Sequence, residues 1–183
     1  YWDGSSLNSL GTGGDDGVVK SIAIEPDTGD VYVGGTFTGM GGVANTGNIA
    51  YWDVSASEWK ALGTGIGGSA TDVLALVFAP NGNLYIGGDF TGADGSGNGD
   101  YICYWDGTNF NAIGDTELNG RVDDIKFNTN GEIYATGNFT NAGGYASADY
   151  IALFKGNEWT SIGALNNNAY DLELYNNKLY VGG

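Results

Sequence analysis

One segment of the chain alternates oxygen-bearing side chains with glycine in a pattern that could bind a metal ion. Residues 94–100 read Asp-Gly-Ser-Gly-Asn-Gly-Asp, with the oxygen donors at Asp94, Ser96, Asn98 and Asp100. Such donors at alternate positions can fold around Ca²⁺, as the acidic loop of a calcium hand does. The segment lacks the distal bidentate Glu of those hands, and the equivalent loops 41–47 and 143–149 keep few of its carboxylates. Two interpretations therefore stay open, a calcium loop and a solvated Gly-Asn turn, and calcium is the one cofactor considered.

The other acidic candidates are two Asp-Asp pairs and an Asp that recurs after Tyr-Trp. The pairs are Asp15-Asp16 and Asp123-Asp124, and the recurring residues are Asp3, Asp53 and Asp106. Two carboxylates that flank a glycosidic bond can cleave it, so a carbohydrate-active hydrolase or lyase using Asp or Glu is one hypothesis. Because the recurring Asp keeps one fixed place in three repeats, we interpret it as a turn cap. We assign no catalytic residue.

Composition excludes several other kinds of site and partner. The chain has no His, which removes imidazole triads and His-based zinc sites. Its 183 residues carry 6 basic and 22 acidic side chains, a net charge of −16 that repels nucleic acid and anionic lipid. No apolar run reaches the roughly 18 residues of a membrane span. Cys103 is the single cysteine, so no intrachain disulfide can form, and we expect it to be a small buried residue.

Asn138 begins a formal N-glycosylation sequon, Asn-Phe-Thr. The same place in the sister repeats holds Thr36 and Asp89, so a small polar residue suits this position with or without a glycan.

These residues lie in a unit of about 50 residues that is repeated along the chain. One motif, a Tyr followed by a glycine-rich stretch, is written four times, at 31–38, 84–91, 133–140 and 179–183. A second motif, Tyr-Trp-Asp, occurs at 1–3, 51–53 and 104–106, with a weaker Leu-Phe-Lys at 153–155. A third, Leu-Gly or Ile-Gly, closes each unit at 10–11, 62–63, 113–114 and 162–163. Three landmarks in a fixed order establish the repeat.

Each unit is predicted to form four short strands, in an all-β fold. The first strands are the apolar runs at 18–24, 73–78, 122–127 and 170–174. Turns rich in Gly, Asn and Pro follow, and the Tyr-x-Gly-Gly motif forms the second strand. Its glycine pair should mark a close approach of backbones or rings. A four-stranded antiparallel unit of this size is typical of a β-propeller blade, with the recurring Trp residues packed between blades. A solenoid is the structural alternative.

The repeat boundaries predict three full blades, at approximately 17–68, 69–120 and 121–167. Residues 168–183 supply the first two strands of a unit and residues 1–16 the last two, so we expect the two ends to form one composite blade and close a ring. The alternatives are a longer chain with a larger ring, or the combination of two copies.

Residues 32–53, from Tyr-Val-Gly-Gly-Thr-Phe-Thr to Tyr-Trp-Asp, with Trp-Lys-Ala-Leu-Gly at 59–63, resemble the kelch-like repeats of the Rax2-like family of fungal cell-polarity surface proteins. Related bacterial and phage surface proteins carry similar Gly-Gly-x-Phe repeats. The resemblance implies a β-propeller on an extracellular, cell-surface or virion-surface protein, and it names no ligand. Galactose oxidase also has kelch repeats, but its copper site needs histidines, which this chain lacks.

The first functional hypothesis is a non-enzymatic interaction or structural module that recognises a protein or glycan through its propeller loops. Tyr and Trp beside Asp and Asn could stack on sugars and hydrogen-bond them. A structural subunit of a phage or filament appendage belongs to the same class. The hydrolase or lyase remains the alternative, and a calcium-dependent adhesin is a third reading.

Overall fold

Each repeat folds into a meander of antiparallel strands in the computed structural model, which describes residues 1–66, 72–93, 99–114 and 118–183. The first sheet has the order β1 (Val19–Ile24), β2 (Val31–Gly35), β3 (Ile49–Asp53), β4 (Glu58–Lys60). The second has β5 (Asp72–Phe78), β6 (Leu84–Asp89), β7 (Ile102–Trp105), β8 (Phe110–Ala112). The third has β9 (Val122–Phe127), β10 (Ile133–Gly137), β11 (Ile151–Lys155), β12 (Glu158–Thr160). A two-stranded sheet follows, β13 (Asp171–Tyr175) with β14 (Lys178–Gly182).

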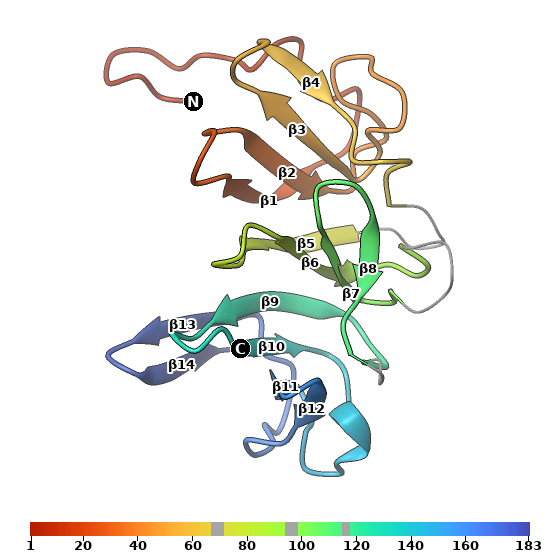
Figure 1. Ribbon diagram of the computed structural model, residues 1–183, viewed down its shortest axis with the longest axis vertical. Helices are drawn as coiled ribbons and strands as arrows, with labels where there is room; N and C mark the ends of the chain where they lie inside the picture. Colours follow the sequence, from red (N-terminus) through yellow and green to blue (C-terminus); the bar gives the residue numbers. More distant parts are fainter. Residues whose placement is uncertain (67–71, 94–98, 115–117) are drawn as a thin grey trace.

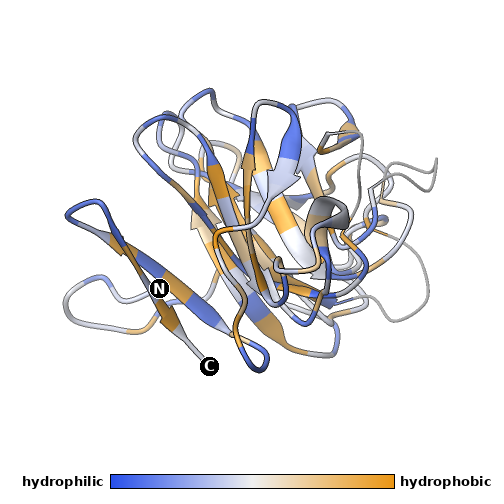
Figure 2. Cartoon of the chain, turned by 90° about the horizontal axis from the view of Figure 1, so that it is seen from below, coloured by the Kyte–Doolittle hydropathy of each residue, from blue (hydrophilic) through white to orange (hydrophobic). Residues whose placement is uncertain are grey.

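The three four-stranded sheets follow one another along the long axis of the molecule, and β13–β14 lies beside β9 (Figure 1). The first strand of each sheet packs against the first and second strands of the sheet before it, so β5 lies on β1 and β2, and β9 on β5 and β6. Hydrophobic residues follow the strands, whereas hydrophilic ones gather at the turns (Figure 2). This arrangement of successive four-stranded blades confirms the predicted all-β propeller architecture. Among the described residues the one helical segment is the short 3-10 turn η1 (Ala142–Gly144). The described part of the chain contains no helix that is long and apolar enough to cross a membrane.

The hairpin turns between the first and second strands use the residues expected from the sequence. Gly29, Gly82 and Gly131 have φ values of 78°, 87° and 78°, and in the fourth repeat Asn176 and Asn177 adopt 51° and 58°. Glycine and asparagine tolerate this left-handed region best. The turns therefore fix where each first strand reverses.

The second glycine of the Gly-Gly motif faces a β-bulge. A Cβ added at Gly35, Gly88 or Gly137 would overlap the carbonyl oxygen of the residue opposite, which is Val18, Asp72 or Arg121. The pairing register shifts at this place in all three sheets, because the first strand carries an extra residue there. The predicted close approach of backbones is confirmed, and any side chain here would push the two strands apart.

The first glycine of the motif faces the next sheet instead. Gly34 lies against Val73, and a Cβ on Gly87 would stand 2.7 Å from Val122 Cγ1. In the third sheet the same place holds the buried Thr136. The position facing that threonine is the small Ala169, whose carbonyl oxygen is 3.5 Å from Thr136 Oγ1. The residues that face each other between sheets are therefore matched in size. Glycine faces valine at two junctions, and threonine faces alanine at the third.

The two ends of the chain hold less regular structure. Residues 1–8 form a small hairpin in which Trp2 pairs with Leu7. The following residues lie on the first sheet, where Trp59 Nε1 donates to Leu10 O at 3.0 Å. β13 and β14 form their own sheet beside β9. The composite blade made from residues 168–183 and 1–16 stays a prediction.

Substituting Gly87 tests the size matching. We expect Gly87→Ala to lower the free energy of unfolding by about 1–3 kcal/mol, because the new methyl group would crowd Val122 and Ile125 on the next sheet. Gly182→Ala is the matched control, since a Cβ there meets no atom nearer than 4.0 Å. Urea unfolding of the two variants measures the difference, and equal losses would contradict the size matching.

Candidate binding face at the long loops

Three long loops join the second and third strands of the sheets. They are residues 36–48, residues 138–150, and a loop described at 90–93 and 99–101. All three leave the sheets at the end where β1, β5 and β9 begin, on the right in Figure 1. We call this end the long-loop face.

The base of each long loop is closed in the same way. A backbone amide at the end of the loop donates to the carbonyl oxygen of a buried Phe at its start, over 2.8–2.9 Å. The amides and their acceptors are Asn48 to Phe37, Tyr101 to Phe90, and Tyr150 to Phe139. The donating residues have φ values of 63°, 64° and 66°. The repeat thus supplies one fixed frame, while the residues between these anchor points differ from loop to loop.

Side-chain hydrogen bonds fasten the first and third long loops further. Asp16 Oδ1 accepts a hydrogen bond from Thr38 Oγ1 at 2.7 Å, and Asn119 Oδ1 accepts one from the backbone amide of Thr140 at 2.8 Å. The carboxylate of Asp149 accepts a bond from the amide of Asn141 at 2.8 Å. Asp16, one of the paired carboxylates considered for catalysis, therefore holds a loop.

The predicted calcium loop falls mostly outside the described residues, because Asp94, Ser96 and Asn98 belong to the segment 94–98. Asp100 is described, and its Oδ1 accepts a hydrogen bond from Gly92 N at 2.6 Å. This contact matches that of Asp149 in the third long loop, so one oxygen of Asp100 closes its own loop. In the part of the chain that the structure describes, no three His, Cys, Asp or Glu residues gather into a possible metal site. Calcium binding stays a prediction.

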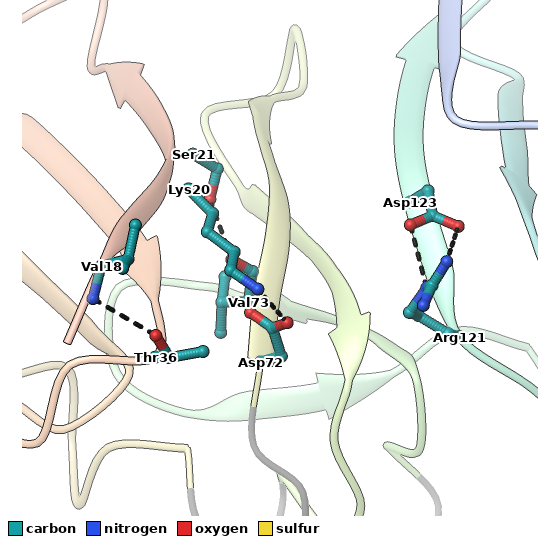
Figure 3. A network of polar contacts seen from close by, with 8 residues as sticks. All are labelled: Val18, Lys20, Ser21, Thr36, Asp72, Val73, Arg121 and Asp123. Atoms are coloured by element: carbon teal, nitrogen blue, oxygen red, sulfur yellow. Dashed lines mark hydrogen bonds and ion pairs between the residues drawn. The ribbon is translucent and has the colours of Figure 1, made fainter. Parts of the chain in front are cut away.

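Charged residues gather where the first strands begin, at the rim of the long-loop face (Figure 3). Lys20 on β1 lies 2.5 Å from Asp72 Oδ2 on β5, so this ion pair bridges two sheets. Arg121 forms a two-point ion pair with Asp123, with Nε 2.9 Å from Oδ1 and Nη2 3.1 Å from Oδ2. No sequence motif predicts the pair of Lys20 with Asp72, because the two residues come from different repeats.

Negative charge exceeds positive charge in this rim cluster, which we define as Lys20, Asp72, Asp89, Arg121 and Asp123. Burial raises the pKa of Asp123, and the nearby carboxylates of Asp72 and Asp89 raise it further, although Arg121 opposes them. Asp72 Oδ1 is buried and has no hydrogen-bond partner among the described residues. The cluster therefore favours groups that carry positive charge or donate hydrogen bonds.

Asp123 and Asp124 do not act as a pair, although they are adjacent in sequence. Asp123 binds Arg121, whereas Asp124 Oδ2 accepts a hydrogen bond from Leu172 N on the next sheet at 2.9 Å. Burial raises the pKa of Asp124, and its hydrogen bonds and Lys126 oppose that rise. Asp124 therefore links the third sheet to the β13–β14 sheet.

The recurring Asp of Tyr-Trp-Asp caps a turn, as the sequence predicted. Asp106 Oδ1 accepts hydrogen bonds from the amides of Thr108 and Asn109 at 2.8 and 2.7 Å. Asp3 and Asp53 make the same kind of contact with amides two or three residues ahead. Backbone amides hold the pKa of Asp3 and Asp106 below the ordinary range, and at Asp53 the largest cause is the hydrogen bond from Lys60.

The repeated tryptophans of the three four-stranded sheets are packing residues. Trp159 and Trp59 are buried, and Trp59 meets Trp52 edge to face with ring centroids 5.5 Å apart. Cys103 is buried as well, as predicted. Tyr145, by contrast, lies on the third long loop with 46% of its surface exposed. It is therefore an exposed aromatic ring on the long-loop face.

Comparison with known proteins identifies the family. The model of the Rax2 C-terminal beta propeller domain matches residues 5–176. The chain belongs to this family. No curated protein matches the chain. Membership in the Rax2 propeller family agrees with the resemblance carried by the Tyr-x-Gly-Gly and Tyr-Trp-Asp motifs.

Solved structures agree on the fold at low sequence identity. A protein described as a putative gluconolactonase superposes with a TM-score of 0.57 at 13% identity, covering 98% of this chain and 61% of that one. U3-55K gives 0.53 at 11% identity, covering 85% and 42%, and the tricorn protease gives 0.54 at 16%, covering 96% and 17%. This Rax2-family chain thus spans less than two thirds of each of these structures, and the likeness concerns the fold alone.

Removing a turn cap has an expected pH signature. Asp106→Ala should lower the melting temperature at pH 7, because two amides lose their acceptor. The pKa of Asp106 is lower in the folded chain than in the unfolded chain. The cap therefore contributes its full stabilisation above the unfolded pKa of about 3.9, and this contribution is lost as the pH falls towards the lower pKa of the folded chain. The deficit of the variant should therefore shrink in acid. Thermal melts between pH 7 and pH 3 check this, with Asp106→Asn as the control that keeps an acceptor oxygen. A deficit that stays constant with pH would contradict the assignment.

Proposed function

We propose that this chain is a non-enzymatic recognition module outside the cell, on a cell or virion surface, which binds a protein or glycan partner through the long-loop face. The observation that carries the proposal is the combination, on one face, of a repeated rigid frame with loops of different sequence. A frame of this kind holds variable loops in place without an ordering cost at binding. The surface location rests on the resemblance to cell-polarity surface proteins.

The electrostatics of the rim cluster indicate the chemistry of the partner. Asp72, Asp89 and Asp123 outnumber the two cations, and the whole chain carries a net charge of −16. A partner with lysine or arginine side chains, or with amino-sugar and hydroxyl groups, complements such a face. The exposed ring of Tyr145 can stack on a sugar or on a cationic side chain.

One observation favours the alternative of a carbohydrate-active hydrolase or lyase. Asp123 has a raised pKa and lies near two other carboxylates, as a general acid in such an enzyme would. Against this, Asp123 is held at two points by Arg121, which restricts its access to a substrate. The binding experiment below separates the two functions by product analysis.

The proposal predicts that the labelled chain binds members of a glycan array or of a basic-peptide array, and that salt weakens the binding. Tyr145→Ala should reduce the affinity about tenfold, as the loss of an interface hot spot does. Tyr175→Ala is the matched control, a tyrosine that is 64% exposed at the β13–β14 turn, at the other end of the strands. Absence of binding to both arrays, or an equal effect of the two variants, would contradict the proposal. Release of cleaved sugar that Asp123→Asn abolishes would support the enzyme instead.

A further inference from the structure

At two of the three junctions between sheets, a tyrosine of the second strand packs among aromatic rings. Tyr32 stacks on Tyr51 of the neighbouring strand, with ring centroids 4.9 Å apart, and meets Phe78 of the next sheet edge to face at 5.1 Å. The second junction repeats this arrangement with Tyr85, Tyr104 and Phe127. Three rings thus pack together beside the hairpin turn at each of these junctions.

The third junction has leucine at both places where the other two have a ring beside the tyrosine. Tyr134 has the register of the two enclosed tyrosines, but the residue opposite it on β11 is Leu153. On the next sheet the place of the two phenylalanines is held by Leu174. The ring of Tyr134 meets no other aromatic ring in the part of the chain that the structure describes. The two leucines therefore leave the ring of Tyr134 without aromatic partners.

A groove with a volume of about 760 Å³ occupies this place, within the size range of small-ligand sites. It runs between the turns of the β9–β10 and β13–β14 hairpins, which lie on the left in Figure 1, at the opposite end of the strands from the long-loop face. The residues of its lining that bear on ligand binding are Asn128, Asn130, Glu132, Tyr134, Leu174 and Asn176. We call this site the hairpin groove.

The hairpin groove is a feature of the two hairpins and not of the free edge of β14. β13 contacts β9 and β10, and no residue of β14 lines the groove. In the four-stranded sheets the third strand pairs with the second, on the edge that faces away from the first. A third strand in this sheet would therefore pair with β14, on the far side from β13.

Hydrogen bonds within the β9–β10 turn fix part of the polar lining and leave the rest available. Asn128 Oδ1 accepts bonds from the backbone amides of Asn130 and Glu132 at 2.9 and 3.0 Å, and Asn128 Nδ2 donates to Glu132 Oε2 at 2.7 Å. The side-chain amides of Asn130 and Asn176 and the hydroxyl of Tyr134 form no hydrogen bond with the described residues. Each of these groups can both donate and accept. The groove therefore offers donors and acceptors to a ligand beside an aromatic ring.

We propose that the hairpin groove binds a neutral saccharide residue, which contacts the ring of Tyr134 and the side-chain amides of Asn130 and Asn176. Sugar hydroxyls donate and accept hydrogen bonds, as carboxamides and a phenol do, and the C–H face of a sugar ring packs on an aromatic ring.

The charge of the lining favours a neutral ligand. Glu132 is the one charged residue in the described lining, and Asn128 already donates to it. The groove thus has no cation for an anionic ligand, and the net charge of −16 on the whole chain repels anions further. This second site is independent of the long-loop face and of the function proposed for it.

The test titrates the chain with the methyl glycosides of glucose, galactose, mannose and N-acetylglucosamine. Saturation-transfer NMR detects contact, and the chemical shifts of the chain give the dissociation constant. At least one glycoside should bind saturably with a dissociation constant of about 1 mM, as expected for a small ligand held by a few hydrogen bonds. Added salt should leave this constant unchanged, because the ligand is neutral. Absence of saturable binding by all four glycosides would overturn the proposal.

A matched pair of asparagine variants locates the binding site. Asn130→Ala should weaken binding about threefold to tenfold through the loss of a hydrogen bond, and it removes no side-chain contact of the described fold. Asn81→Ala is the control, because Asn81 holds the same place before the turn glycine of the second sheet. Asn81→Ala should bind as the wild type does, and equal losses in the two variants would contradict the site.

Filling the groove gives a second, independent measurement. Leu174→Phe restores the ring found at Phe78 and Phe127, so it should weaken binding about tenfold or more, while the melting temperature shows that the variant is folded. Tyr145→Ala, on the long-loop face, should leave the binding unchanged. Binding that Tyr145→Ala removes while Leu174→Phe and Asn130→Ala keep it would overturn the hairpin groove and would support the long-loop face as the glycan site instead.

Discussion

The distance between neighbouring sheets is the constraint on which this structure depends. It is set where the first strand of one sheet approaches the first glycine of the Gly-Gly motif on the sheet before it. At Gly87 the space for a side chain is taken by Val122, and in the third sheet Thr136 takes that space because Ala169 leaves it free. Protein interiors are packed closely enough for a single methyl group to matter. The fold therefore needs a size match at each junction as well as an apolar strand.

The two glycines of the Gly-Gly motif leave space for two different neighbours, which explains why they recur together. The first admits the neighbouring sheet, and the second admits the bulge within its own sheet. The bulge lies where the first strand begins, next to the long loops. The packing of the sheets and the position of the long-loop face are thus coupled, because the strands whose starts carry Lys20, Asp72 and Arg121 are also the strands that dock.

Much of the fold could be read from the sequence because it is repeated. The spacing of Tyr-x-Gly-Gly and Tyr-Trp-Asp located the strands, and the fixed place of Asp106 after Trp indicated a turn cap, which the structure confirms. The ion pair of Lys20 with Asp72 could not be predicted in this way, since it joins residues of two repeats that share no motif. Adjacency in sequence was misleading for Asp123 and Asp124, because neighbouring residues on a strand have different partners. The calcium segment lies largely in residues 94–98, which the structure does not describe, so the sequence pattern alone supports it.

The coupling free energy between Gly87 and Val122 tests the size-matching account most directly. A double-mutant cycle of Gly87→Thr, Val122→Ala and the combined variant recreates at this junction the pair found at Thr136 and Ala169. If the sizes of the facing residues control docking, the combined variant loses less stability than the sum of the two single changes, by about 1 kcal/mol or more. Additive losses would show that the two residues have no coupling free energy, and would contradict the account.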